Sequence, residues 1–313
     1  MEKFPEEWIR SAPAIRSALF VPGHRDDLFT KATNSGADGI ILDLEDAVPE
    51  TRRDEARGKV RNFLSHRRSD RCAVFVRINA LDEKCLDEDL AAAVSPGVSA
   101  ILIPKISYED EVLGLEQALG RHERSLGIDK EIFIWPLLET ARGVRRAFEI
   151  SSCSRRIAYV GASVSRNGDL ARALGVLHTG TFQESLFVRS KVLLDARAAG
   201  IVNPIGGVCT QIGDLDAVER DARFMRSLGY EGMMAIHPSQ VKILNSVFSP
   251  SDADVAAATK LVREFQRAQK EGKGALKHQG SMIDFAHFRT AEALLKQAAA
   301  NASRQSSSRP ESE

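Results

Sequence analysis

Runs of apolar residues, rich in β-branched side chains, recur along the chain, and turn-favouring residues bound each of them. Eight such runs stand at residues 14–23, 39–48, 72–79, 98–106, 132–140, 156–164, 200–208 and 232–238. The runs are continuously apolar rather than alternating, which is typical of strands covered on both faces. We therefore expect eight buried, parallel strands.

Amphipathic patterns between these runs predict helices. Before the eighth run, for example, Leu215, Val218, Ala222 and Met225 recur at spacings of three and four residues. Alternation of strands and helices favours a parallel sheet, and eight units of roughly 30 residues predict a (β/α)8 TIM barrel. A doubly wound open sheet is the alternative. The first run lacks the G-x-G-x-x-G turn of a Rossmann domain, which favours the barrel.

The pattern changes after the eighth run, where Ser251 is a candidate N-cap for a further helix and a glycine-containing stretch precedes a short helix at about 286–299. The residues after Ala300 are polar and are predicted to be disordered. The predicted organisation has four parts: an N-terminal extension (1–13), the barrel (14–270), a C-terminal extension carrying the sequence GSMID (271–299) and a disordered tail (300–313).

Composition narrows the class of protein. The chain carries 43 basic and 43 acidic side chains and no formal net charge, which argues against a general nucleic-acid or membrane-surface binder. It shows neither an apolar window long enough to span a bilayer nor a secretory signal. The four cysteines lie far apart without a C-x-x-C pair, which indicates reduced thiols and a cytoplasmic protein rather than disulfides or a zinc site.

Polar residues follow the apolar runs at the strand ends where barrel enzymes place their active sites. The set is Asp43, Glu45 and Asp46 after the second run, Arg77 after the third, Lys105 after the fourth, Glu139 after the fifth, Asp169 after the sixth and His237 after the eighth. Each also has a structural explanation, such as a solvated strand end, a helix N-terminus or a turn. Their recurrence at one face favours a functional site.

Glu139 and Asp169 follow adjacent strands and can together hold one hard divalent cation. Mg²⁺ leaves its remaining positions for water and substrate oxygens. A substrate with a carboxylate beside a hydroxyl or keto oxygen can chelate such an ion, which then acts as a Lewis acid. Arg77 offers a planar fork for a carboxylate or an oxyanion. This chemistry suits carbon–carbon cleavage or condensation through an enolate.

Eight ordered stretches extend from about Arg16 to about Leu295. They are RSALFVPG, ILDLEDAV with the following EAR, VRIN, LLETARG, DLARALG, ARAAG, MMAIHPSQV with the later N-x-VFSPS, and GSMID. In these stretches the chain resembles the citrate lyase β-subunit-like proteins of the HpcH/HpaI aldolase family. The resemblance implies a (β/α)8 barrel, assembled as a trimer or hexamer, whose C-terminal extension packs on a neighbouring subunit.

The same resemblance implies a Mg²⁺-dependent lyase. Its substrate would be a 3-hydroxy-3-carboxyacyl-CoA thioester of the citramalyl, malyl or citryl type, cleaved to a 2-keto acid and acetyl-CoA or formed by the reverse condensation. Carried over by position, Glu139 and Asp169 would bind the metal, and Arg77 would hold the substrate carboxylate and the enolate oxygen. Asp284 in GSMID resembles the acid–base aspartate, which would reach the site of a neighbouring subunit.

The resemblance also assigns the surrounding residues. Arg16 and the cluster of Asp43, Glu45 and Asp46 would shape the pocket and orient Arg77 and water at the metal. Glu45 or Asp46 would thereby help to remove the proton of the substrate hydroxyl. The remaining candidate substrate-binding residues are Lys105 and His237, the latter near the thioester arm.

The sixth run departs from the family pattern F-G-x-x-D-L, because it reads VGASVSRNGDL. Without an insertion the metal position would fall at Val164, which cannot bind a cation. An insertion at Ser163–Gly168 restores the register at Asp169 and is the preferred interpretation. Three alternative functions stay open: a pyruvate-class aldolase, a malyl-CoA-type thioesterase, and a non-catalytic barrel that binds an acyl carrier or partner subunit.

Overall fold

The computed structural model describes residues 12–67, 72–278 and 281–307. The chain divides into two compact units, residues 1–246 and 247–313. The described helices include none that is long and apolar enough to cross a membrane. All four cysteines are free thiols, which confirms that disulfides do not hold the fold together.

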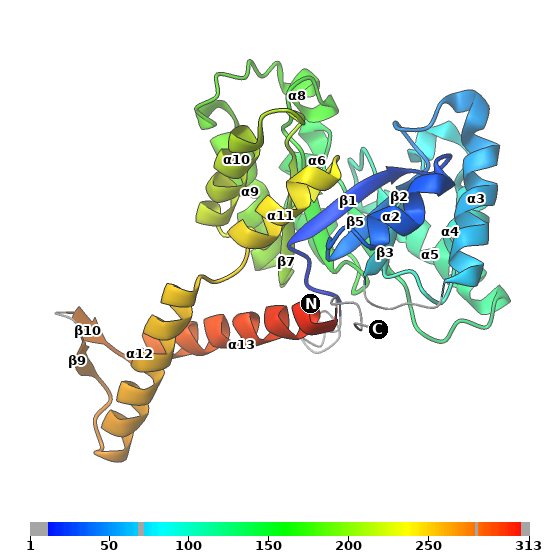
Figure 1. Ribbon diagram of the computed structural model, residues 1–313. Helices are drawn as coiled ribbons and strands as arrows, with labels where there is room; N and C mark the ends of the chain where they lie inside the picture. Colours follow the sequence, from blue (N-terminus) through cyan, green and yellow to red (C-terminus); the bar gives the residue numbers. More distant parts are fainter. Residues whose placement is uncertain (1–11, 68–71, 279–280, 308–313) are drawn as a thin grey trace. The chain divides into compact units, whose positions relative to one another are not determined.

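Parallel strands form the centre of the first unit (Figure 1). In its described part they are β1 (Ser17–Pro22), β2 (Gly39–Asp43), β3 (Ala73–Arg77), β4 (Ala100–Ile103), β5 (Phe133–Pro136), β6 (Tyr159–Ala162), β7 (Asn203–Val208) and β8 (Gly232–Ala235). They pair in the order β5-β4-β3-β2-β1-β8-β7-β6. Two isolated parallel bridges, Ile134–Ile157 and Leu137–Gly161, join β5 to β6. The predicted (β/α)8 barrel is confirmed, and every strand lies within a predicted run.

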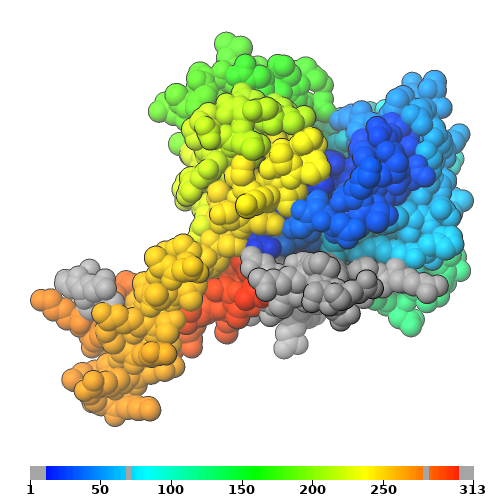
Figure 2. All heavy atoms as spheres, in the orientation of Figure 1, coloured from blue at the N-terminus to red at the C-terminus, as the bar shows by residue number. Residues whose placement is uncertain are grey.

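Helices follow the strands and cover them from outside. They are α2 (Phe29–Thr33), α3 (Arg53–His66), α4 (Leu86–Ala93), α5 (Glu109–Ser125), α6 (Ala141–Arg145), α7 (Ala147–Ser152), α8 (Asp169–Leu174), α9 (Gln183–Ala198), α10 (Leu215–Leu228) and α11 (Pro238–Val247). Short 3-10 turns stand at Asp26–Leu28, Glu50–Arg52 and Leu81–Glu83. Figure 2 shows atoms of α10 and α11, coloured yellow-green and yellow, on the surface of this unit. On α10, Val218, Ala222 and Met225 of the predicted stripe are buried, whereas its first member, Leu215, is exposed.

Three aromatic rings pack in the barrel interior. The ring of Phe75 lies edge-on to those of Trp135 and Tyr159, with centroids 5.2 and 5.4 Å away, and the latter two rings stack at 4.9 Å. All three side chains are fully buried. The Tyr159 hydroxyl donates a hydrogen bond to the Pro13 carbonyl at 2.6 Å, so its polar atom has a partner. The interior is therefore a packed core, and polar chemistry is confined to the barrel ends.

A close approach of backbone fixes the turn after β1. The Gly23 amide donates to the Asp43 carbonyl at 2.7 Å, and a Cβ at Gly23 would lie 2.6 Å from that oxygen. Glycine is required here because any side chain would push the turn away from the end of β2. This contact brings the loop after β1 against the strand that carries the acidic cluster.

The second unit consists of α12 (Asp252–Lys270), an antiparallel pair of β9 (Leu276–His278) and β10 (Ser281–Ile283), and α13 (Phe285–Ser307). Ser251 caps α12 as predicted, because its hydroxyl accepts from the Asp254 amide at 3.1 Å. Phe265 of α12 stacks on Phe288 of α13 at 5.1 Å. Helix α12 thus buries its apolar face within the second unit, whereas the sequence placed residues up to 270 in the barrel.

Helix α13 is longer than predicted. The sequence indicated a helix at about 286–299 and a disordered tail from residue 300, but the helix continues to Ser307. The residues from 300 to 307 are polar yet contain no glycine or proline, so nothing in them stops a helix that is already formed. The start of the predicted tail is therefore wrong, and its last part, 308–313, lies outside the described residues.

Candidate active site

Asp43 fixes the guanidinium of Arg77 at the ends of β2 and β3, where the two residues are direct partners in the sheet. The Nε and Nη2 atoms of Arg77 donate to the two carboxylate oxygens of Asp43 at 2.6 and 2.7 Å. Those oxygens also accept from the amides of Glu45 and Ala47 at 3.1 and 3.0 Å. Asp43 has no exposed surface, so it orients Arg77 as expected. Its assignment as a substrate-binding residue is wrong, since its oxygens are filled and inaccessible.

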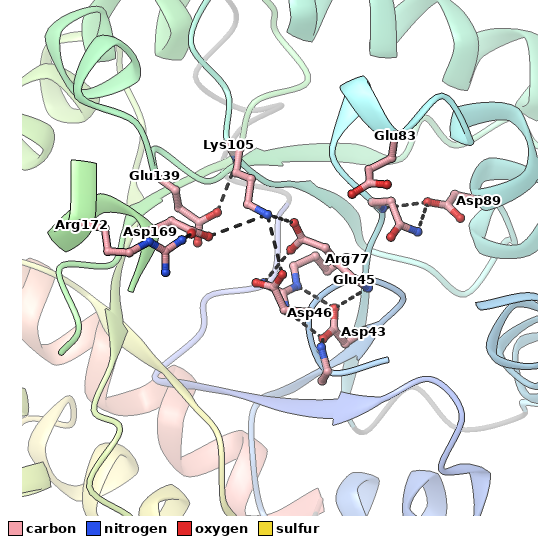
Figure 3. Close-up of polar contacts among 12 residues, drawn as sticks. Asp43, Glu45, Asp46, Arg77, Glu83, Asp89, Lys105, Glu139, Asp169 and Arg172 are labelled. Atoms are coloured by element: carbon pink, nitrogen blue, oxygen red, sulfur yellow. Dashed lines mark hydrogen bonds and ion pairs between the residues drawn. The ribbon is translucent and has the colours of Figure 1, made fainter. Parts of the chain in front are cut away.

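Glu45 lies between two cations (Figure 3). Its carboxylate oxygens are 3.0 Å from Nη1 of Arg77 and 2.8 Å from Nζ of Lys105. Burial raises the pKa of Glu45, and the charges of Arg77 and Lys105 oppose that rise. Asp46 lies farther from the same two nitrogens, at 3.6 and 3.7 Å, and 58% of its side chain is exposed. Both carboxylate oxygens of Glu45 thus form ion pairs, whereas the carboxylate of Asp46 is accessible to solvent and substrate.

Arg77 is enclosed by partners on several sides. Besides its carboxylates, its guanidinium lies over the ring of Phe20 at 4.8 Å from the centroid. Burial alone would lower the pKa of Arg77, but Asp43 and Glu45 more than reverse this and raise it. The side chain therefore stays positively charged in a fixed orientation.

Lys105 bridges the two sides of the site. It follows β4 and adopts a left-handed backbone conformation with φ of 58°, which is uncommon outside glycine. Its amide donates to Oε2 of Glu139 at 3.3 Å, and its Nζ lies 3.8 Å from a carboxylate oxygen of Asp169. Burial acts to lower the pKa of Lys105, but Glu45 and the other carboxylates raise it above its ordinary value. The ammonium is therefore retained among the acidic groups.

Glu139 and Asp169 line one cavity of about 440 Å³ together with Lys105 and Thr140. Glu139 follows β5, and Asp169 is the first residue of α8 after the loop from β6. Burial raises the pKa of Glu139 to about 7; Arg77 opposes the rise, and nearby carboxylates including Asp169 add to it. The structure brings Asp169 to the lining of this cavity, whereas Val164 is buried and is not among the lining residues. This placement supports the interpretation with an insertion.

The donor set suits a hard cation. Across the described residues, no three or more histidine, cysteine, aspartate or glutamate side chains are arranged as a metal site. The protein thus offers the two carboxylates of Glu139 and Asp169, and Mg²⁺ is commonly held by one or two carboxylates, with waters and substrate oxygens completing its shell. Burial is the main cause of the raised pKa of Glu139, and neighbouring carboxylates add to it; a divalent cation would favour the ionised carboxylate. The residues present therefore fit Mg²⁺.

Arg16 is not part of this site. It precedes β1 and forms a two-pronged ion pair with Asp38, which precedes β2, at 2.7 and 2.8 Å. Both residues stand at the amino-terminal ends of parallel strands, whereas the acidic cluster stands at the carboxyl-terminal ends. The expectation that Arg16 shapes the pocket is therefore wrong, because a strand separates it from the pocket.

His237 and Asp284 are both exposed. The Nδ1 atom of His237, just after β8, lies 2.8 Å from the Ser239 hydroxyl. Asp284 belongs to the second unit and caps α13, since its carboxylate accepts from the amides of Ala286 and His287 at 3.0 and 3.3 Å. A further 2.7 Å contact with Nδ1 of His287 lowers the pKa of Asp284. Substrate contact by His237 and the acid–base role of Asp284 stay predictions.

Several polar residues of the cavity region escaped sequence reasoning, among them Asp82, Ser107 and Glu111 of the lining, as well as Thr140 and Arg172. Thr140 lines the cavity and caps α6, its hydroxyl accepting from the Gly143 amide at 2.9 Å. Arg172 forms an ion pair with Asp169 from one turn farther along α8. The spacing of an aspartate and an arginine three residues apart was a usable signal for this pair.

A closed parallel barrel with an arginine and carboxylates at the carboxyl ends of its strands has the arrangement of a barrel enzyme. This chain belongs to the HpcH/HpaI aldolase/citrate lyase family, whose model matches residues 16–238. The family resemblance inferred from the sequence motifs is confirmed.

Relatives of this chain include both lyases and thioesterases. It is 36% identical to a citrate lyase subunit beta-like protein of Deinococcus radiodurans, over 92% of this chain and 99% of the relative. It is 31% identical to a (3S)-malyl-CoA thioesterase of Cereibacter sphaeroides, over 92% and 96%. It is 30% identical to an L-malyl-CoA/beta-methylmalyl-CoA lyase of Rhodobacter capsulatus, over 90% and 94%.

Among solved structures, CitE from Mycobacterium tuberculosis in complex with magnesium, acetoacetate and coenzyme A superposes with a TM-score of 0.73. It is 28% identical, and the match covers 93% of this chain and 99% of that one.

Proposed function

We propose that this protein is a Mg²⁺-dependent carbon–carbon lyase. It would cleave a 3-hydroxy-3-carboxyacyl-CoA thioester, of the citramalyl, malyl or citryl type, to a 2-keto acid and acetyl-CoA, or catalyse the reverse condensation. The observation that carries the proposal is the clamped guanidinium of Arg77 at the same strand ends as the two carboxylates of Glu139 and Asp169. The magnesium, acetoacetate and coenzyme A of the similar CitE structure agree with this substrate class.

Glu139 and Asp169 would hold Mg²⁺, which would supply Lewis-acid polarisation of the C–O bond of the keto-acid half. Arg77 would stabilise negative charge as the thioester enolate develops. Asp43 keeps the guanidinium oriented before the substrate arrives, so little reorganisation is needed in the transition state. One preorganised donor of this kind typically contributes about 3–4 kcal/mol.

We assign removal of the hydroxyl proton to Asp46 rather than to Glu45. The oxygens of Glu45 are both engaged by Arg77 and Lys105, so Glu45 positions these cations. Asp46 is exposed and makes only long contacts with them. In cleavage Asp284 would first take up a proton from solvent and then donate it to the enolate carbon, whereas in condensation its carboxylate would act as the base. The lowered pKa of Asp284 keeps it ionised, which suits removal of the acetyl proton in condensation.

Assembly is part of the proposal. In it the chain forms a trimer or hexamer in the cytoplasm, and Asp284 serves the site of a neighbouring subunit. Mixing inactive Arg77→Ala and Asp284→Asn subunits should then restore part of the activity, since some sites receive both intact residues. No recovery in verified mixed oligomers would place both residues in one chain's site.

A thioesterase is the second candidate, because several relatives about 30% identical carry the name (3S)-malyl-CoA thioesterase. The products distinguish the two reactions. Purified protein would be incubated with Mg²⁺ and a panel of acyl-CoA thioesters and 2-keto acids, and the products identified by mass spectrometry. Acetyl-CoA with a 2-keto acid indicates the lyase, whereas free coenzyme A with a hydroxy acid indicates the thioesterase.

The same assay tests the metal site. Glu139→Ala and Asp169→Ala should each abolish the dependence of activity on Mg²⁺, because each removes one of two proposed ligands. Unchanged activity in both variants would remove the metal assignment. Turnover of free pyruvate with aldehydes instead of thioesters would support the aldolase alternative. An absence of both turnover and Mg²⁺ binding would support a binding protein.

A further inference from the structure

Both carboxylate oxygens of Asp169 are already engaged by cations of this chain. Arg172 forms an ion pair with Oδ1, and Nζ of Lys105 lies 3.8 Å from Oδ2. Asp169 is thus the meeting point of a helix-surface arginine and a lysine from the end of β4 (Figure 3). A metal ion that uses these oxygens has to compete with both side chains.

Lys105 occupies the space between the acidic groups. Its Nζ also lies 2.8 Å from Glu45 and 3.7 Å from Asp46, and its backbone amide donates to Glu139. Lys105 therefore contacts both proposed metal ligands: its backbone amide contacts Glu139, and its side-chain ammonium contacts Asp169. The left-handed backbone at Lys105 is strained for a residue other than glycine, and the surrounding ion pairs offset that strain.

The charges around the cavity explain why a lysine is held here. The carboxylates of the site are Asp43, Glu45, Asp46, Glu139 and Asp169, and the cations are Arg77, Lys105 and Arg172. When all are ionised, these five carboxylates outnumber the three cations by two, and Asp82 and Glu111, which also line the cavity, increase the acidic excess. A divalent cation would reduce this excess, and without it Lys105 and Arg172 supply part of the compensation. Arg77 does not take part because Asp43 fixes it.

We propose that Lys105 and Arg172 are internal competitors of Mg²⁺ that set the affinity of this protein for the metal. In the metal-free protein they hold Asp169 and the acidic cluster in place. When Mg²⁺ binds, Arg172 leaves Asp169 for solvent, and the ammonium of Lys105 withdraws towards Glu45 and Asp46. The inference rests on the metal site of the proposed function and adds the residues that tune it.

The two residues should differ in strength. Arg172 is 69% exposed, and exposed ion pairs are weak, so its removal should tighten Mg²⁺ binding by about two- to five-fold. Lys105 is 35% exposed and contacts three carboxylates. Its removal should tighten binding more, by about ten-fold, because the cluster loses a partly desolvated charge.

The test is isothermal titration calorimetry of Mg²⁺ into the full-length protein without substrate. Wild type is compared with Arg172→Gln and Lys105→Met. Arg223→Gln is the matched control, since Arg223 is 67% exposed and pairs with Glu219 one turn away on α10, far along the chain from the site. The dissociation constant should fall in both test variants and stay unchanged in the control.

Thermal unfolding supplies a second readout. Without Mg²⁺, Lys105→Met should unfold at a lower temperature than wild type, because the acidic groups lose their counter-ion. Saturating Mg²⁺ should raise its unfolding temperature more than that of wild type. Should Lys105→Met fail to fold, the exposed Arg172→Gln variant still decides the matter by calorimetry.

Unchanged or weaker Mg²⁺ binding in Arg172→Gln and Lys105→Met would overturn the inference. Absence of Mg²⁺ binding by the wild type would overturn it too, along with the metal assignment. If the variants bind Mg²⁺ more tightly but the protein has no lyase activity, the inference is confirmed and the proposed reaction is wrong. The two proposals therefore fail separately.

Discussion

Asp43→Ala tests whether the orientation of Arg77 is built into the fold. The substitution removes the carboxylate that accepts two hydrogen bonds from Arg77 and one each from the amides of Glu45 and Ala47. Arg77, only 10% exposed, then keeps Glu45 at 3.0 Å as its nearest charged partner. The variant thus leaves a buried cation only partly compensated.

The expected cost is about 3–5 kcal/mol of unfolding free energy, the range for removing one partner of a buried ion pair. This is a large share of the roughly 5–15 kcal/mol that stabilises a typical domain. We expect the lower part of the range, because Glu45 still neutralises some of the charge. Activity should be lost as well, since Arg77 is no longer held in place.

Urea unfolding followed by the fluorescence of Trp135, buried in the barrel core, measures the cost. The control is Asp27→Ala, which removes the same two-pronged geometry from Arg25 at 2.7 Å, but on the surface. Asp27→Ala should shift the midpoint far less. An equal shift in the two variants would refute the reasoning. The double variant Asp43→Ala with Arg77→Met should regain part of the stability, because the buried guanidinium is gone and Glu45 keeps Lys105 as its cation.

Three further outcomes are expected. Asp284→Asn should lower kcat far more than it raises KM, because the amide cannot exchange the proton; a change in KM alone, seen in steady-state kinetics, would make Asp284 a binding residue. With chelator present, wild type should lose up to about 3 kcal/mol of unfolding free energy between pH 5 and 8 relative to Glu139→Gln. The reason is that the pKa of Glu139 is about 7 in the folded state and lower in the unfolded state, so the folded protein binds an extra proton at low pH. Parallel stability curves from urea titrations of the two proteins would contradict this. Ser251→Ala should cost about 1 kcal/mol through loss of the α12 cap, and Ser251→Asp, which keeps a capping oxygen, should restore most of it in thermal unfolding followed by circular dichroism.

Continuous apolarity was enough to predict the barrel, because strands such as Gly39–Asp43 are buried at every position and need no alternation. The strand-end residues Arg77, Lys105, Glu139 and Asp169 could also be found, since a barrel gathers the carboxyl ends of its strands at one face. Arg16 was misplaced because its role came from the family resemblance alone, although it stands at the start of the first run and the site lies where the strands end. The actual partner, Asp38, is apparent only from the sheet register.

Other features depended on tertiary contacts. The burial of Asp43 could not be read from LDLEDAV, where Asp43, Glu45 and Asp46 look equivalent, yet one is inaccessible, one is ion-paired and one is exposed. The assignment of α12 to the second unit is supported by the stacking of Phe265 on Phe288, a contact between two helices that the sequence pattern does not pair. The length of α13 reflects the absence of a stop signal rather than a positive pattern.

The join between β5 and β6 has a mechanical consequence. Neighbouring strands elsewhere in the described barrel share continuous ladders, but these two meet only at two isolated bridges. Glu139 follows one of these strands and Asp169 follows the other. An ion held by both would reinforce the barrel across its most sparsely bonded joint, adding a third link to the two bridges that already close it.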